Sequence, residues 1–399
     1  MGKTLVLAEK PSVGREIARV LGCKNGGNGY LEGGNYIVTW ALGHLVTLAD
    51  PDAYEKKWEK WDLQELPMLP EKMKLVVIPE SRRQYQVVSG LMKRADVSEL
   101  VIATDAGREG ELVARWIMQK AGWGGPARRL WISSQTDKAI REGFANLKPA
   151  ADYDDLFRSA QARSEADWLV GLNVTRALTC KYGAQLSAGR VQTPTLAMIV
   201  AREEAISHFI PERFYTVDLR CGFIASSPRL NSKEEAEKIA ALCQYKTATV
   251  KSIEKKKRTE KPPKLYDLTA LQRDANRLYG YSAQQTLDYT QALYESRLVT
   301  YPRTDSRYLT GDMEKTLPEL VQAVSGAFLF TSGVNHPVHP TQVIDDDKVS
   351  DHHAIIPTLD MARADLTSLP AGQMDVLQLI VVRLLAAVGE DHEYEETTI

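Results

Sequence analysis

The chain has 399 residues and a formal net charge of −2, with 44% hydrophobic and 26% charged residues. This composition is that of a globular protein and excludes a disordered chain. The length exceeds one ordinary core, so we expect about two to four domains. The overall charge gives no sign of a polyanion partner, so any nucleic acid must bind a local basic groove.

Cysteine spacing and hydropathy limit the cellular setting. The four cysteines form no C-x-x-C pair, which disfavours a structural zinc site and fits a reduced cytosolic setting. No apolar run approaches membrane-spanning length, and the N-terminus leads directly into a predicted strand. We therefore expect a cytoplasmic protein that is neither secreted nor inserted in a membrane.

Strands and helices alternate over the first 150 residues. The predicted strands are 4–8, 36–40, 74–78, 100–104 and 128–132, and the predicted helices are 13–21, 81–94 and 136–147. This alternation predicts a mostly parallel sheet covered by helices on both faces. Residues 1–150 should therefore form one α/β domain.

Carboxylates follow two of these strands. Glu9 and Lys10 come directly after the first strand, and Asp105 precedes a helix whose first turn contains Glu109 and Glu111. Parallel strands end at one edge of a sheet, and carboxylate oxygens suit a hard cation such as Mg²⁺. An acidic turn that complements the helix dipole is the alternative for the second group. For Glu9 and Lys10, the alternative is a surface charge pair.

Tryptophans and basic residues suggest a second type of contact. Trp58 and Trp61 lie among lysines, where they could stack on bases or cap a small hydrophobic core. A long helix predicted over 152–182 contains Arg163, Asp167 and Arg176. After it, small residues beside Arg190 and Gln192 would let backbone amides approach a phosphate at the start of the next helix.

The second half of the chain is mainly helical. Helices are predicted at 195–205, 232–242, 267–278, 282–295 and 374–388, and strands at 214–220, 247–253 and 394–399. The pair 267–278 and 282–295 resembles a winged-helix or helix-turn-helix element. The charged run 254–264 is interpreted as an exposed linker.

Two further motifs contain reactive side chains. Tyr301 lies two residues before Arg303, and a tyrosine hydroxyl can act as a nucleophile where a cation stabilises the phenolate and the phosphate. Most tyrosines beside proline only pack. His352 and His353 precede a short apolar segment, and a phosphate-contacting or proton-handling role is favoured over metal binding, with a purely structural role as the alternative.

The order of these motifs resembles type IA DNA topoisomerases, most closely the bacterial topoisomerase III group. Residues 300–306, Thr-Tyr-Pro-Arg-Thr-Asp-Ser, match the nucleophile motif of that family, and 189–194 and 352–358 match two further signatures. The acidic segment and Glu9 resemble a Toprim domain. The resemblance implies a multidomain α/β and α+β fold, in which a Rossmann-like Toprim domain is followed by helical and winged-helix-like domains of a torus.

The resemblance also implies roles for particular residues. Tyr301 would attack a phosphodiester of single-stranded DNA and stay joined to the 5′ phosphate, while Arg303 and His352 contact phosphate. Lys10 would stabilise developing charge or protonate the departing 3′ oxygen. Glu9, Asp105 and Glu109 would share a Mg²⁺ site. The implied DNA-binding residues are Trp61, Arg163, Asp167, Trp168, Arg176, Ser187, Ala188, Gly189, Arg190, Val191, Gln192 and Arg303.

The implied chemistry needs no ATP, because a tyrosyl phosphate keeps the energy of the broken bond. The sequence accordingly contains no G-x-x-x-x-G-K-[ST] loop. Gly107 stands where many family members have a second aspartate, so one metal ion is expected. The partners implied are single-stranded regions of duplex DNA, with a helicase left open, and the chain is expected to be monomeric and associated with the bacterial nucleoid or plasmids.

The family's torus continues beyond the nucleophile domain, so we expect this chain to lack part of the ring. The expected segments are a Toprim domain (1–150), a helical DNA groove (151–212), the first part of a β-rich arch (213–266), a nucleophile domain (267–390) and the start of a return segment (391–399). The predicted function is relaxation and decatenation by cleavage and religation of single strands. The alternatives are a truncated, inactive remnant that binds single-stranded DNA, and another Toprim enzyme such as a primase or nuclease.

Overall fold

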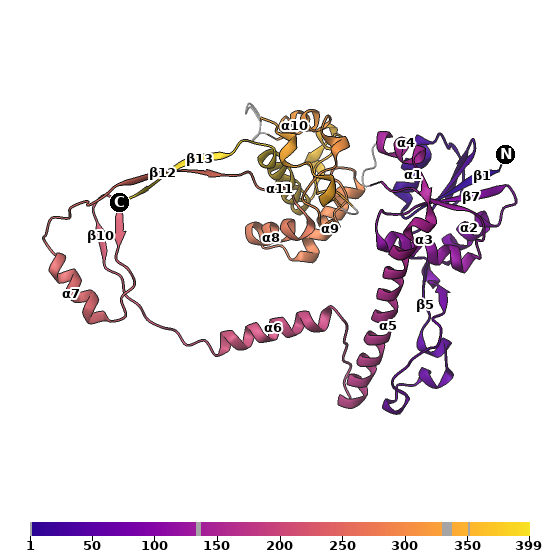
Figure 1. The fold of residues 1–399 in the computed structure, drawn as a ribbon, viewed down its shortest axis with the longest axis horizontal. Coiled ribbons are helices and arrows are strands. Elements are labelled where there is room, and N and C mark those ends of the chain that lie inside the picture. The colour runs from indigo at the N-terminus through magenta and orange to yellow at the C-terminus, as the bar shows by residue number, and fades with distance from the viewer. Residues whose placement is uncertain (1, 133–136, 329–336, 350–351) are drawn as a thin grey trace. The chain divides into compact units, whose positions relative to one another are not determined.

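The computed structural model describes residues 2–132, 137–328, 337–349 and 352–399 (Figure 1). The chain forms two compact units, one made of Met1–Ser187 and Glu260–His392 and the other of Ala188–Thr259 and Glu393–Ile399. These units divide the chain at other positions than the five segments expected from sequence, whose boundaries stay a prediction. Of the helices in the described part of the chain, none is long and apolar enough to cross a membrane.

A seven-stranded sheet organises the N-terminal part of the first unit. Its strands are, in spatial order, β2 (Asn25–Gly27), β3 (Tyr30–Gly33), β4 (Tyr36–Trp40), β1 (Lys3–Ala8), β7 (Val97–Ala103), β8 (Ala127–Arg129) and β9 (Lys148–Pro149). The four central strands, β4, β1, β7 and β8, run parallel. The predicted parallel core of the sheet is therefore confirmed, and its carboxyl ends meet at one edge.

Alternation along β1 and β7 builds two hydrophobic layers. Leu5 and Leu7 face a cluster that includes the helices α2 (Arg82–Met92) and α3 (Arg108–Ala121), whereas Val6 and Ala8 face α1 (Pro11–Val20) and α4 (Asp137–Ala145). Side chains alternate between the faces of a strand, so a wholly apolar strand fits a sheet covered on both sides. Figure 1 shows α1 and α4 over one face and α2 and α3 over the other.

One predicted strand belongs to a different sheet. The segment 74–78 forms β6 (Leu75–Val77), which pairs antiparallel with β5 (Val46–Leu48) outside the main sheet. Its apolar residues resemble those of the other strands, so composition could not reveal which neighbour it pairs with. Position 136 of the predicted helix 136–147 lies outside the described residues, and the rest of that helix corresponds to α4.

The long helix α5 (Asp154–Tyr182) has the predicted extent to within two residues. The segment between β5 and β6 contains three short 3-10 helices, η1 (Pro51–Ala53), η2 (Lys56–Glu59) and η3 (Leu63–Glu65), and packs against α5. Asn173 donates from its side chain to the carbonyl oxygen of Met68 (3.1 Å) and accepts from the Met68 amide (2.6 Å). Trp58 is buried in this contact, in agreement with the interpretation as a small hydrophobic core.

A second hydrophobic core lies in the Glu260–His392 part of the first unit. Its helices are α8 (Leu268–Tyr279), α9 (Ala283–Glu295), α10 (Leu317–Ser325) and α11 (Ala371–Ala387). Gly280 lies between α8 and α9 with a φ of 73°, a left-handed conformation that glycine adopts without strain. The predicted helix pair is therefore confirmed. Short 3-10 helices also occur here: η6 (Gly311–Met313), η8 (Pro340–Gln342), η9 (Asp346–Lys348), η10 (Met361–Arg363) and η11 (Leu366–Ser368).

The second unit contains α6 (Gln192–Ser207), α7 (Lys233–Cys243) and two small sheets. One sheet pairs β10 (Asp218–Arg220) with β11 (Ile224–Ser226), and the other pairs β12 (Glu254–Glu260) with β13 (His392–Thr398). The interpretation of 254–264 as a linker is wrong, because most of this run is β12. The strand predicted at 247–253 is not formed. Oppositely charged side chains join the two strands, with Lys255 paired to Glu395 (2.8 Å) and Arg258 to Glu396 (2.7 Å).

Candidate active site

Two strand ends hold the first pair of candidate residues. Glu9 and Lys10 lie between β1 and α1, where Pro11 occupies the first helical turn, and Asp105 follows β7. A carboxylate oxygen of Glu9 accepts a hydrogen bond from the Asp105 amide (3.1 Å). Lys10 Nζ lies 2.8 Å from Asp105 Oδ2. The parallel pairing of β1 with β7 thus brings Asp105 to Glu9 and Lys10, although almost a hundred positions of sequence separate them.

The nucleophile candidate lies beside these residues. Lys10 Nζ is 4.0 Å from the centroid of the Tyr301 ring. The His352 ring lies 4.4 Å from the Tyr301 ring, centroid to centroid, and its Nε2 is 3.4 Å from Asp105 Oδ2. Asp105 is therefore the common neighbour of Lys10 and His352.

Backbone pairing fixes Tyr301 next to His352. The amide of Thr300 donates to the Ile356 carbonyl (2.9 Å), and its hydroxyl donates to the Ala354 carbonyl (3.0 Å). Thr304 completes the arrangement by donating its hydroxyl to the carbonyl of His352 (2.7 Å). The segments that contain Tyr301 and His352 are thus held side by side by hydrogen bonds, as two short paired strands would be.

Neighbouring charges shift the pKa values of Glu9, Asp105 and Lys10. Burial and the negative charge of Asp105 raise the pKa of Glu9. Burial would also raise the pKa of Asp105, but the His352 hydrogen bond and the Lys10 charge outweigh it and lower that pKa. The charges of Asp105, Tyr301 and Glu9 likewise outweigh burial and raise the pKa of Lys10. The site therefore holds Asp105 as an anion and Lys10 as a cation.

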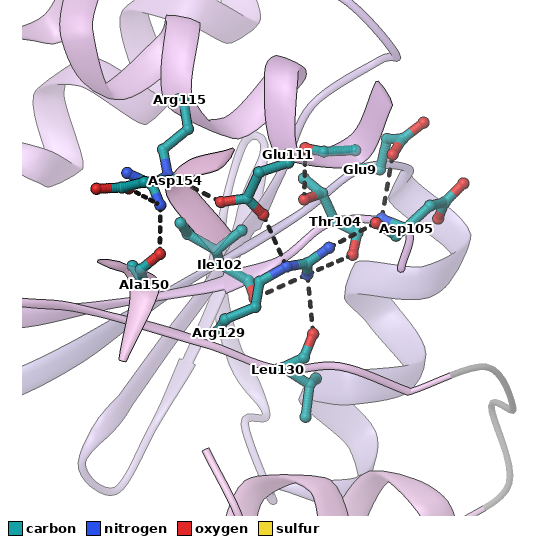
Figure 2. A network of polar contacts seen from close by, with 11 residues as sticks. Glu9, Ile102, Thr104, Asp105, Glu111, Arg115, Arg129, Leu130, Ala150 and Asp154 are labelled. Atoms are coloured by element: carbon teal, nitrogen blue, oxygen red, sulfur yellow. Dashed lines mark hydrogen bonds and ion pairs between the residues drawn. The ribbon is translucent and has the colours of Figure 1, made fainter. Parts of the chain in front are cut away.

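The remaining acidic residues do not join this pair. Glu109 is exposed and pairs with Arg163 (2.7 Å), while Glu111 is fully buried between Arg115 (2.8 Å) and Arg129 (3.0 Å), as Figure 2 shows for Glu111. No three histidine, cysteine or carboxylate side chains in the described ranges are arranged to hold a metal ion. The convergence of Asp105, Glu109 and Glu111 expected from the sequence is thus not seen for Glu111.

Two carboxylates nevertheless suit a divalent cation. Glu9 and Asp105 are partly buried and lie at one edge of the sheet. Their negative charges repel each other, and a bound cation would reduce this repulsion. Their oxygens are the hard ligands that Mg²⁺ and Mn²⁺ prefer. The donor set therefore fits such an ion, with Glu9 and Asp105 as the residues that would hold it.

The candidate DNA-binding residues fall in both units. On α5, Trp168 donates its ring N–H to the Ala49 carbonyl (2.9 Å), and Arg176 donates to the Trp58 carbonyl (2.6 Å). The Arg176 guanidinium also lies 5.1 Å from the Trp61 ring, which is 49% exposed. Trp168 and Arg176 therefore hold the segment between β5 and β6, and the Trp61 ring remains accessible on its surface.

The loop before α6 is mostly exposed. Ser187 is exposed and ends the first stretch of the first unit, whereas Ala188 is buried and begins the second unit. The amide of Gly189 donates to the Thr193 hydroxyl (3.0 Å), and Arg190, Val191 and Gln192 are exposed. Arg303 is exposed as well, and Asp167 lies 3.9 Å from Arg163.

The structure adds one residue beside Tyr301 that the sequence analysis did not name, and it brings the segment before a second such residue, His44, to the backbone of Glu9. The edge of the Tyr294 ring packs on Tyr301 with centroids 5.3 Å apart, and its hydroxyl hydrogen-bonds with Ser12. His44 follows β4, and the neighbouring Gly43 amide donates to the Glu9 carbonyl (3.3 Å). His44 was detectable, because the predicted parallel sheet already placed the end of strand 36–40 at the site. Tyr294 had no such signal.

Comparison with known sequences places the chain in a family. The sequence model of the DNA topoisomerase family matches residues 151–399, which is more than half of the chain, and that of the Toprim domain matches residues 4–134. The chain belongs to the type IA DNA topoisomerase family. Toprim domains bind divalent metal ions, and membership in this family implies DNA binding.

Individual relatives narrow the group. The DNA topoisomerase 3 of Bacillus cereus (strain ATCC 14579) is 50% identical over 100% of this chain and 56% of the relative. The DNA topoisomerase 3 of Bacillus licheniformis is 49% identical over the same shares. These relatives support the topoisomerase III group as the branch to which the chain is similar. The chain spans about half the length of these relatives.

A solved structure supports the fold. The full-length topoisomerase I from Thermotoga maritima has a TM-score of 0.70 with this chain, at 23% identity over 98% of this chain and 62% of the other. The predicted mixed α/β fold with a Toprim domain is thereby confirmed.

Proposed function

We propose that the chain cleaves and religates single-stranded DNA through a covalent link between Tyr301 and the 5′ phosphate, as part of a topoisomerase III-like enzyme. The single observation that carries this proposal is the packing of Tyr301 beside Lys10, which is itself paired with Asp105. A tyrosine needs an adjacent cation to become an effective nucleophile and leaving group. Lys10 supplies that cation at 4.0 Å from the ring centroid.

The proposed steps use the residues of this site. The Tyr301 hydroxyl loses its proton to solvent as its oxygen attacks phosphorus, and the bond from phosphorus to the 3′ oxygen breaks. Lys10 gives a proton to the departing 3′ oxygen and regains one from solvent, so no net proton is gained or lost. His352 and Arg303 contact the phosphate. Religation reverses these events, and since the broken bond is exchanged for a tyrosyl phosphate, ATP is not required.

A Mg²⁺ ion held by Glu9 and Asp105 would neutralise phosphate charge and hold the DNA ends for religation. Glu109 is a third candidate ligand, although it is paired with Arg163. Phosphate contact by Arg163 would release Glu109 toward the metal, which would couple DNA binding to metal binding. We propose Asp167, Trp168, Arg176, Trp61 and residues 187–192 as the other contacts to the single strand.

The cellular role extends these proposals. Strand passage would relax and decatenate DNA in the bacterial cytoplasm, at nucleoid or plasmid regions where a helicase could supply single strands. The chain would act as a monomer. For the domain boundaries we propose the five segments expected from sequence.

The first prediction concerns the nucleophile. The chain is incubated with a 3′-end-labelled single-stranded oligonucleotide and Mg²⁺, then denatured, and labelled protein is measured on a gel. We expect an adduct with the wild type and none with Tyr301→Phe, because phenylalanine lacks the attacking oxygen. Tyr279→Phe serves as the matched control, because Tyr279 is a partly exposed tyrosine on α8. This variant should form as much covalent adduct as the wild type.

The same gel separates the alternatives. An undiminished adduct with Tyr301→Phe would refute the assignment of the nucleophile. Shortened oligonucleotide without attached protein would indicate a Toprim nuclease. No adduct in the wild type, together with oligonucleotide binding that weakens steeply with salt in a separate titration of the undenatured chain, would indicate a DNA-binding remnant.

A further inference from the structure

A buried arginine lies directly behind the proposed metal site. Arg129, at the end of β8, and Glu111, in the first turn of α3, both have fully buried side chains. The Arg129 guanidinium donates four hydrogen bonds to backbone carbonyls (Figure 2). The acceptors are Ile102 (3.2 Å), Thr104 (2.7 Å), Leu130 (2.8 Å) and Asp105 (2.6 Å).

These bonds begin where the sheet stops. The pairing of β7 with β8 ends at Ile102 opposite Arg129, two residues before Thr104. Beyond that point, the side chain of Arg129 takes over the role of a strand partner for the Thr104 and Asp105 carbonyls. The Asp105 carbonyl also accepts from the Gly107 amide (2.9 Å). The backbone that carries the Asp105 carboxylate is therefore fixed from two sides.

Stability alone does not explain a charged pair in this place. A buried ion pair loses the hydration of both charges, and well-packed hydrophobic residues of similar volume are often as stabilising or more so. A hydrophobic residue at position 129 could fill the space, but it could not donate to the carbonyl of Asp105. Only arginine can donate several hydrogen bonds at once from one planar group to the carbonyls of Thr104 and Asp105.

We propose that Arg129, with Glu111 as its counter-charge, is a positioning residue that fixes the direction in which the Asp105 carboxylate enters the divalent-metal site. It acts through the backbone and does not touch substrate or metal. Residues that orient a metal ligand from behind typically change metal affinity when they are replaced. This inference rests on the proposed role of Asp105 as a metal ligand.

The test uses three variants of the full chain. The double variant Arg129→Met with Glu111→Leu removes both charges together, so neither is left unpaired. Arg129→Lys keeps the charge but cannot donate to four carbonyls. Arg115→Met is the matched control, because Arg115 contacts Glu111, Asp154 and the Ala150 carbonyl on the side away from Asp105.

Three measurements separate positioning from folding. Mn²⁺ binding is measured by the loss of the free-ion electron paramagnetic resonance signal, folding by thermal unfolding, and the order of residues 104–111 by amide hydrogen exchange. We expect the double variant to stay folded, to bind Mn²⁺ roughly 10- to 100-fold more weakly and to exchange faster in this segment. The Mn²⁺ affinity of Arg129→Lys should lie between that of the double variant and that of the wild type. Arg115→Met should bind Mn²⁺ with the wild-type affinity.

Wild-type Mn²⁺ affinity in the folded double variant would overturn the inference. If the double variant unfolds, Arg129→Lys decides: weakened Mn²⁺ binding supports the inference and unchanged binding overturns it. Failure of the wild type to bind Mn²⁺ would instead overturn the proposed metal site, and this inference with it. The failure of the positioning role and the failure of the metal site can therefore be told apart. In the first case the Arg129 variants bind Mn²⁺ as the wild type does, and in the second case the wild type does not bind it.

Discussion

At the scale of single residues, chemically similar carboxylates lie in different surroundings. Asp105 faces Lys10 and His352 at the edge of the sheet, whereas Glu111, six positions later, is enclosed by Arg115 and Arg129. Both lie in one strand-loop-helix segment, so local sequence assigns them to the same acidic group. The location of Arg129 on the neighbouring strand decides which carboxylate stays accessible for chemistry.

A second prediction concerns a carboxylate outside the site. Glu32 accepts two hydrogen bonds from Arg94 (2.9 and 3.1 Å) and pairs with Lys3, and the hydrogen bonds from Arg94 and Lys3 lower its pKa. Because the folded-state pKa is below the unfolded one, this stabilisation is complete above the unfolded pKa of about 4.3 and is lost as the pH falls through the folded pKa. Glu32→Gln should therefore lower the free energy of unfolding by about 1 kcal/mol at pH 7.

The measurement is urea unfolding between pH 7 and pH 3. The difference between the wild type and Glu32→Gln should shrink as the pH drops below about 4.3. Glu80→Gln, at an exposed position, is the control and should change stability by less than about 0.5 kcal/mol. Parallel stability curves for the wild type and Glu32→Gln would contradict the prediction.

At the scale of elements, the start of α3 depends on a close backbone approach. A Cβ atom at Gly110 would lie 2.1 Å from the carbonyl oxygen of Asp105, and the Thr104 hydroxyl donates to the Gly110 carbonyl (2.8 Å). Helix propensity favours alanine over glycine, but the contact forbids it here. The close backbone contact between Asp105 and Gly110 therefore overrides helix propensity.

The third prediction compares two helical glycines. Gly110→Ala should destabilise the first unit by about 2 kcal/mol or more, because the clash moves the Asp105 backbone. Gly90→Ala, on an exposed face of α2 with no atom within 4 Å of the new Cβ, should stabilise it by about 0.5–1 kcal/mol. Chemical denaturation of both variants checks the prediction, and a gain of stability in both would contradict it.

At the scale of the whole molecule, the two units differ in core formation. The first unit contains all three hydrophobic clusters. Of the hydrophobic side chains described in the second unit, only Ala188 and Ala236 are buried. Leu196, Met198 and Ile199 on α6 are more than half exposed. Local stability follows the density of buried apolar contacts, so the two units should open at different free energies.

The fourth prediction tests this difference by hydrogen exchange. Amides of β1 and β7 should be protected up to the global free energy of unfolding, and amides of α6 should exchange much faster, because exposed hydrogen bonds open locally. Mass spectrometry of the intact chain at low protein concentration gives both sets of rates. Equal protection in β7 and α6 would contradict the prediction.

The sequence by itself determined the elements whose signal is local. Short continuous apolar runs predicted β1 and β7, and helical periodicity predicted α5 and the α8–α9 pair, because both are local patterns. Short motifs at Glu9, Asp105, Tyr301 and His352 indicated the family, because their combination and order along the chain resemble those of type IA topoisomerases. The periodicity of a segment does not say where its partner lies.

Tertiary structure decided the pairings. The charged segment of β12 is a strand because it pairs with β13, some 140 residues later, and two ion pairs join the strands. Strand 74–78 joined β5 instead of the main sheet. The enclosure of Glu111 by Arg129, the pairing of Glu109 with Arg163 and the packing of Tyr294 on Tyr301 likewise depend on long-range contacts. Sequence gives each segment its local preference, but the choice of partner depends on burial and charge compensation, which exist only once the chain has folded.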